Sequence, residues 1–332
     1  MENNLWHGLA ARALEGQPIS PAEALAVLRA PDDELLDQLA AAYHVRRHYH
    51  GNRVHLNYLI NAKSGQCGED CGYCSQSRIS QADIPRYRLL DADALFAGAE
   101  TAALRRATTY CIVLSGRSPT PADMDVLGRV GPRVKSELPL RLCASVGLLD
   151  DRQAAELRAA GVDRVNHNLN TSRRFYPQIC TTHDYQQRLD TLAAVRRAGM
   201  EICSGGIVGM GETDEDVADL ALCLASQQVE ALPVNFYLPI PGTPASTQAR
   251  PLDPKHCLRC LVLFRLANPR AELRIAAGRE VHLRSLQPLG LYAADSIFVG
   301  DYLTTQGQAA EDDYRMIADL GFEAVCDGMA GA

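Results

Sequence analysis

Three cysteines stand within eight residues of the sequence, in the stretch CGEDCGYC at positions 67–74. Cys67, Cys71 and Cys74 have the spacing CxxxCxxC, and the next cysteine along the chain is Cys111. A structural zinc site normally uses four protein ligands, so three thiols without a nearby fourth indicate an open metal site. Such a site leaves one coordination position for a small molecule, which is typical of a site that performs chemistry.

Thiolates are the usual ligands of iron–sulfur clusters, and three of them can hold three irons of a cubane while the fourth iron stays free. The spacing of Cys67, Cys71 and Cys74 therefore predicts a 4Fe-4S cluster with one open iron. A partial zinc site is the alternative.

Short apolar runs and amphipathic stretches alternate after residue 50 and predict the scaffold that positions these thiols. The expected strands occupy residues 54–60, 110–116, 140–146, 163–170, 201–209, 232–240, 272–278 and 296–300. Eight strands that alternate with helices predict an α/β (βα)8 barrel of the TIM type, with a doubly wound open sheet as the alternative. Residues 1–50 carry apolar residues at helical spacing and are expected to form an N-terminal helical extension. We expect the barrel to span residues 51–322 and a C-terminal tail to span 323–332.

Composition and charge limit the class of protein. The net charge of −7 argues against a nucleic acid or an anionic membrane surface as the main partner. No run of about 18 apolar residues predicts a membrane span, and the first residues do not resemble a secretory signal. We therefore expect a cytoplasmic protein, in which cysteines are thiols or metal ligands more often than disulfides.

Polar residues in the expected strands mark a second candidate region. Cys111, Cys143 and Cys203 fall in or near three different expected strands. A single strand cysteine is usually a packed core residue, but three of them on separate strands of one barrel favour a lumenal site. Alternation along a strand places Asn166, Asn168 and Asn170 on one face, with His167 pointing away from the lumen. The pair Cys257 and Cys260 lies in an expected helix, where we interpret both as packing residues.

The cysteine loop, with Tyr73 before its last cysteine, resembles that of the radical S-adenosylmethionine (SAM) enzymes. Longer stretches resemble the biotin synthase family from about residue 40 to residue 322: NAKSGQCGEDCGYCSQS, YCIVLSGR, GVDRVNHNLNTS, CSGGIVGMGET, PVNFYLPIPGTP, LRIAAGRE and LYAADSIFVGDYLTT. The resemblance implies sulfur insertion into dethiobiotin, with SAM and two iron–sulfur clusters as cofactors. It also implies a reductase-type electron donor such as flavodoxin or ferredoxin, and a homodimer.

The resemblance assigns roles to individual positions. An auxiliary cluster, 2Fe-2S by default although a larger one is left open, would be held by Cys111, Cys143, Cys203 and Arg274. The alternative for Arg274, a buried arginine in an expected strand, is an internal ion pair. SAM would contact Tyr73, Asn168 and Asn170, where the family members more often carry Asp at the last position. The ureido ring of dethiobiotin would meet Asn166, Asn168 and Asn235, and its carboxylate would meet Thr304 and Thr305. Another radical SAM enzyme on the same barrel, such as a lyase or a cofactor-assembly protein, is the nearer alternative, and a non-enzymatic iron–sulfur protein the farther one.

Overall fold

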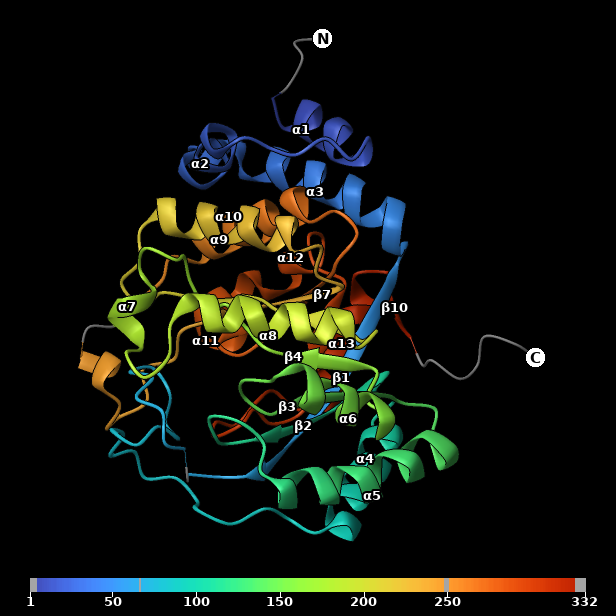
Figure 1. Cartoon of the computed structure of the whole chain (residues 1–332). Coiled ribbons are helices and arrows are strands. Elements are labelled where there is room, and N and C mark those ends of the chain that lie inside the picture. Colours follow the sequence, from blue (N-terminus) through green and yellow to red (C-terminus); the bar gives the residue numbers. More distant parts are fainter. Residues whose placement is uncertain (1–4, 66, 248–250, 326–332) are drawn as a thin grey trace.

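Parallel strands form a closed barrel at the centre of the molecule (Figure 1). We describe it from a computed structural model, in which residues 5–65, 67–247 and 251–325 are described. Neighbouring strands pair in the order β1, β2, β3, β4, β5, β7, β8 and β9, and β9 pairs with β1 to close the barrel. The bounds of these strands are β1 (Arg53–Lys63), β2 (Thr109–Leu114), β3 (Arg141–Ser145), β4 (Arg164–Asn166), β5 (Glu201–Cys203), β7 (Ala231–Phe236), β8 (Glu272–Ile275) and β9 (Ser296–Phe298). The predicted (βα)8 barrel is confirmed, and the open sheet is excluded.

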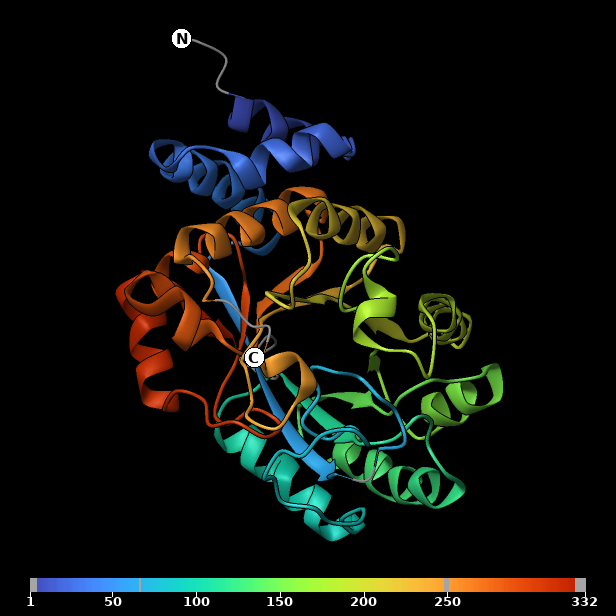
Figure 2. The ribbon, with the colours of Figure 1, turned by 90° about the vertical axis from the view of Figure 1, so that its left-hand side faces the viewer.

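Helices surround the strands as an outer ring (Figure 2). The ring contains α4 (Ala92–Leu104), α5 (Pro121–Glu137), α6 (Asp151–Ala159), α8 (Tyr185–Arg197), α9 (Asp214–Ser226), α10 (Pro254–Ala267) and α13 (Ala310–Asp319), with the short helices α7 (Tyr176–Ile179), α11 (Arg279–Leu283) and α12 (Gln287–Gly290) between them. The loops that end helices α6 and α8 turn at Gly161 and Gly199, whose φ angles of 85° and 74° favour glycine.

Two expected strands differ from the observed ones. The fourth ends at Asn166, so only its first half is a strand. The fifth is split into β5 and β6 (Gly206–Val208), which also pairs with β7. A Cβ on Gly205 would lie 1.9 Å from the carbonyl oxygen of Pro233, so the backbone at the break packs too closely on β7 for any other residue.

The N-terminal extension forms α1 (Leu5–Leu14), α2 (Pro21–Arg29) and α3 (Leu35–His50), as the sequence predicts. Ser20 and Glu23 form a capping box at the start of α2. These helices pack outside the helical ring, against α9 and α10 (Figure 2).

The chain continues past residue 322 in the sheet. Strand β10 (Glu323–Val325) lies in the segment expected as a tail and runs parallel to β1. The rest of the expected tail, which includes Cys326, lies outside the described residues. The predicted division of the chain into segments 1–50, 51–322 and 323–332 stays a prediction. None of the helices in the described part of the chain is long and apolar enough to span a bilayer.

Candidate active site

The three loop cysteines lie at the carboxyl end of β1, where barrel enzymes build their active sites. Cys71 is buried, Cys67 and Cys74 are half-buried, and all three line a cavity of about 370 Å³. The segment 179–182 holds the cysteine loop in place by backbone hydrogen bonds. The Gly72 backbone N–H donates to the Ile179 carbonyl at 2.8 Å, and the backbone N–H groups of Thr181 and Thr182 donate to the Asp70 carboxylate at 2.9 and 3.1 Å. The thiols are therefore held at defined positions around the cavity mouth.

The electrostatic setting of these thiols suits cation binding. Burial raises the pKa of Cys67, and it raises the pKa of Cys74 to about 11. The Cys71 thiol donates a hydrogen bond to the sulfur of Cys180 at 3.7 Å, and this contact together with burial raises the pKa of Cys71. Buried thiolates need a positive partner, so a cluster of iron ions fits this donor set and would release protons on binding.

A second set of thiols lies deeper in the barrel. Cys111 on β2 and Cys143 on β3 are paired directly by the register of the two strands, and their sulfurs are 3.3 Å apart. Cys203 on β5 is fully buried, and burial raises its pKa to about 12. Cys111 also lines the cavity of the loop cysteines, so the inner set reaches this cavity through one of its three thiols.

Arg274 on β8 joins this lumenal set. One guanidinium nitrogen, Nη1, lies 3.9 Å from the sulfur of Cys203, and Nη2 donates to Glu272 at 2.6 Å. Glu272 also pairs with Arg164 at 2.7 Å. Although burial opposes it, these two arginines hold the pKa of Glu272 well below its usual range. The ion pair given above as the alternative role of Arg274 therefore exists, and it leaves one nitrogen of Arg274 beside a thiol.

The inner thiols fit a bound iron–sulfur cluster. Cys111, Cys143 and Cys203 offer thiols, which are the usual ligands of such clusters, and one nitrogen of Arg274 lies beside Cys203. Elsewhere on the strands, Asn57 donates to Ser296 at 2.7 Å, while its Oδ1 and the hydroxyl oxygen of its register neighbour Thr109 have no hydrogen-bond partner among the described residues.

The predicted asparagines all line the cavity, although not from one strand. Asn166 ends β4, whereas Asn168 and Asn170 lie in the segment after it. Asn170 has a φ of 71°, which asparagine tolerates, and its amide donates to the Tyr73 hydroxyl at 2.7 Å. The Oδ1 of Asn168 accepts from the backbone of Gly205 at 3.1 Å.

Residues from the last third of the chain complete the cavity wall. Asn235 on β7 donates to the Gly206 carbonyl at 3.1 Å and accepts from the Ala277 backbone at 3.2 Å. Thr304 and Thr305, in the loop after β9, also line the cavity, and the Thr304 hydroxyl lies 2.9 Å from that of Ser75.

Several cavity residues were not predicted from the sequence. Arg188 on α8 lines the cavity and donates to the carbonyl of Asn168 at 2.7 Å. Its charge on the otherwise apolar face of that helix is the sequence feature that could have identified it. Glu69 and His183 line the cavity as well. His167 follows the last residue of β4, is buried, and lies among the residues of the cavity wall, with its Nε2 3.5 Å from Arg188; that it points away from the lumen stays a prediction.

The pair Cys257 and Cys260 is separate from this site. Both side chains lie on α10 with no exposed surface and belong to the main hydrophobic core. The interpretation of the pair as packing residues is confirmed.

Comparison with known proteins identifies the class of this site. The sequence model of the Radical SAM superfamily matches residues 63–224, and that of the Biotin and Thiamin Synthesis associated domain matches residues 233–323. The barrel with its cysteine loop is thus that of a radical SAM protein.

Full-length relatives narrow the class. The biotin synthase of Rhodopirellula baltica is 51% identical over 98% of this chain and 91% of its own length. That of Geobacillus thermodenitrificans is 51% identical over 96% of each chain. The chain belongs to the biotin synthase family.

Solved structures support the fold. Methylornithine synthase superposes with a TM-score of 0.82 at 19% identity, over 96% of this chain and 98% of that one. The hydrogenase maturase HydG from Carboxydothermus hydrogenoformans gives a TM-score of 0.80 at 16% identity, over 97% and 79% of the two chains. At such identities the likeness concerns the fold alone.

Proposed function

We propose that this protein is a biotin synthase, which uses SAM to insert sulfur between two unactivated carbons of dethiobiotin. The observation that supports this most directly is an inner thiol set that reaches the cavity of the loop cysteines through Cys111 and has a guanidinium beside it. Radical generation alone needs only the loop set, so the inner set indicates a second cofactor that takes part in the reaction.

In this proposal the cofactors are held by separate residues. Cys67, Cys71 and Cys74 bind the 4Fe-4S cluster that acts on SAM. The auxiliary cluster, 2Fe-2S by default, is bound by the lumenal residues Cys111, Cys143, Cys203 and Arg274. When bound, the first cluster and SAM supply the hydrogen-abstracting radical, and the auxiliary cluster supplies the sulfur.

The polar residues of the cavity position the two small molecules. Asn166, Asn168 and Asn235 carry amides that match the donors and acceptor of a cyclic urea, and they face the same space. We assign the substrate carboxylate to Thr304 and Thr305, and the SAM site to Tyr73, Asn168 and Asn170. The hydrogen bond between Asn170 and Tyr73 fixes both side chains of the SAM site relative to the cysteine loop.

The protein's contribution is mainly geometric. It holds the reacting groups at contact distance within the barrel and excludes water from the radical. A flavodoxin-like or ferredoxin-like electron donor, a homodimer and a cytoplasmic location stay predictions.

The test is an anaerobic assay of the reconstituted protein with a strong reductant, SAM and dethiobiotin. We expect 5′-deoxyadenosine, methionine and biotin as products. Cleavage of SAM without any biotin would show that the chain is a different radical enzyme, and an absence of SAM cleavage would favour a non-enzymatic iron–sulfur protein. Iron and sulfide analysis with Mössbauer spectroscopy on the same sample gives the type of the auxiliary cluster.

A further inference from the structure

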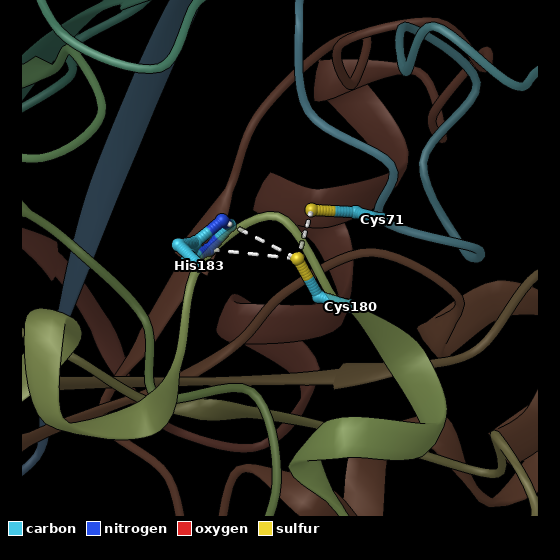
Figure 3. Close-up of side chains that lie close together, drawn as sticks. All are labelled: Cys71, Cys180 and His183. Atoms are coloured by element: carbon cyan, nitrogen blue, oxygen red, sulfur yellow. Dashed lines mark hydrogen bonds between the residues drawn. The ribbon is translucent and has the colours of Figure 1, made fainter.

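A second cluster of metal-binding side chains lies beside Cys71. Cys180 directly follows α7, and His183 comes three residues later; both are buried, with 4% and 6% of their surface exposed. The sulfur of Cys180 is 3.7 Å from that of Cys71 and 3.3 Å from Nδ1 of His183 (Figure 3). The two segments that carry these residues are far apart in the sequence, and their side chains converge on one point.

The spacing suits a single ion. Two thiolates bound at about 2.3 Å to one tetrahedral ion lie roughly 3.8 Å apart, and a thiolate and an imidazole nitrogen about 3.5 Å apart. The donor atoms of Cys71, Cys180 and His183 all lie within 4.8 Å of one another. In a cubane each thiolate binds a different iron, so Cys180 stands too close to Cys71 to serve as a further cluster ligand in this arrangement.

The surroundings also suit a cation. The Nε2 of His183 is 2.8 Å from the hydroxyl of Tyr176, so an imidazole bound through Nδ1 would keep a hydrogen bond on its other nitrogen, as metal-bound histidines do. The carboxylate of Glu69 contacts Nδ1 of His183, and that of Asp70 lies 3.3 Å from the Cys180 sulfur. These carboxylates add negative charge beside the three donor atoms, although neither belongs to the group of donor atoms that lie within 4.8 Å of one another.

We propose that the cluster-free protein binds one thiophilic divalent ion, zinc or ferrous iron, through Cys71, Cys180 and His183. This mononuclear site goes beyond the proposed function and does not depend on it. Only one consequence rests on that function: because Cys71 is shared, the ion and the 4Fe-4S cluster exclude each other.

The test uses the full-length protein, stripped of iron and kept anaerobic with a phosphine reductant so that no disulfide forms. Cobalt(II) is the probe, because tetrahedral cobalt bound to thiolates has strong visible absorption. We expect one cobalt per chain with that spectrum, displaced by zinc and by ferrous iron in separate titrations. Cys180→Ser and His183→Gln should each weaken cobalt binding at least tenfold.

The controls distinguish this site from the cluster site. Cys67→Ser and Cys74→Ser each remove a proposed cluster ligand from the same cavity but should leave the cobalt spectrum unchanged, whereas Cys71→Ser should abolish it. A second arm loads one equivalent of zinc before iron and sulfide are added; this should slow cluster formation in the wild type and not in Cys180→Ser.

The inference is overturned if folded wild-type protein, checked by circular dichroism, gives no tetrahedral cobalt spectrum. It is also overturned if Cys180→Ser binds cobalt like the wild type, or if Cys67→Ser and Cys74→Ser lose binding equally. Biotin formation by the wild type is measured separately and reports on the proposed function alone.

Discussion

Cys71 is the residue that the two proposed metal sites share, because it lines the cavity and its sulfur also contacts that of Cys180. If it binds the first cluster, Cys71→Ala leaves two thiolates, which cannot present one defined open iron. We expect 5′-deoxyadenosine formation to fall by more than about a hundredfold. Loss of a residue that only hydrogen-bonds to a metal ligand typically costs about 10- to 100-fold in activity, and loss of the ligand itself should cost more.

The matched control is Cys223→Ala, which removes a half-buried thiol on α9 that accepts a hydrogen bond from Tyr185 at 3.4 Å and is separate from the cavity lining. It should keep both cluster content and SAM cleavage. Normal 5′-deoxyadenosine production by Cys71→Ala would contradict the assignment of the loop.

Cys143 tests the inner set, because its sulfur contacts Cys111 and not the loop cysteines. Cys143→Ala should remove a ligand of the sulfur donor while it leaves the SAM site in place. We expect 5′-deoxyadenosine to form and biotin to be absent, both measured by liquid chromatography of single-turnover mixtures.

The control for this substitution is Cys260→Ala, a fully buried thiol outside the barrel lumen, with circular dichroism on both variants to verify folding. If folded Cys143→Ala produces biotin at the wild-type rate, the lumenal cysteines are core residues and the sulfur has another source.

At the scale of elements, α10 shows how two cysteines at metal-like spacing can serve packing alone. Cys257 and Cys260 are fully buried on α10, a helix that contacts the N-terminal helices on one side. The double variant Cys257→Ser/Cys260→Ser should keep full iron content and activity but lose roughly 1–3 kcal/mol of stability, because it buries two hydroxyls in the core. Iron analysis and urea unfolding measure the two effects, and a loss of about four irons per chain would show that the pair ligates a cluster.

The elements also show what a sequence can predict. The eight strands and the cysteine loop follow from local patterns, and the convergence of Cys111 and Cys143 follows from strand order, because equivalent positions of adjacent parallel strands lie side by side. The resemblance supplied Arg274, whose ion pair with Glu272 is only visible in three dimensions.

Residues outside the strands escaped prediction. Cys180 and His183 lie in the segment between α7 and α8, and they reach the site only because that segment packs on the cysteine loop. The break at Gly205 goes with the close approach of its backbone to Pro233 of β7, which no local pattern contains. Tertiary packing, and not local propensity, decides these features.

At the scale of the whole molecule, His50 connects the N-terminal extension to the barrel. It ends α3, its Nδ1 lies 3.1 Å from the carboxylate of Asp295, and its Nε2 lies 3.2 Å from Arg265 of α10. The side chain of His50 is only 12% exposed. Burial lowers the pKa of His50 from 6.5 to about 4, with Asp295 opposing the shift.

This shift links stability to pH with a definite sign. The folded protein holds His50 neutral, while the unfolded chain takes up a proton near pH 6.5, so the stabilisation is fully present above that pH and is lost as the pH falls toward 4. Through this group the protein should be roughly 2 kcal/mol less stable at about pH 5 than at pH 8.

The His50→Gln variant tests this prediction. Its side chain cannot titrate, so its free energy of unfolding in urea should fall less than that of the wild type between pH 8 and pH 5. The difference in unfolding free energy between the two proteins reports on His50 alone, because cluster loss and the other acid-sensitive groups affect both proteins equally. Parallel curves for wild type and His50→Gln would show that protonation of His50 does not control the junction between the extension and the barrel.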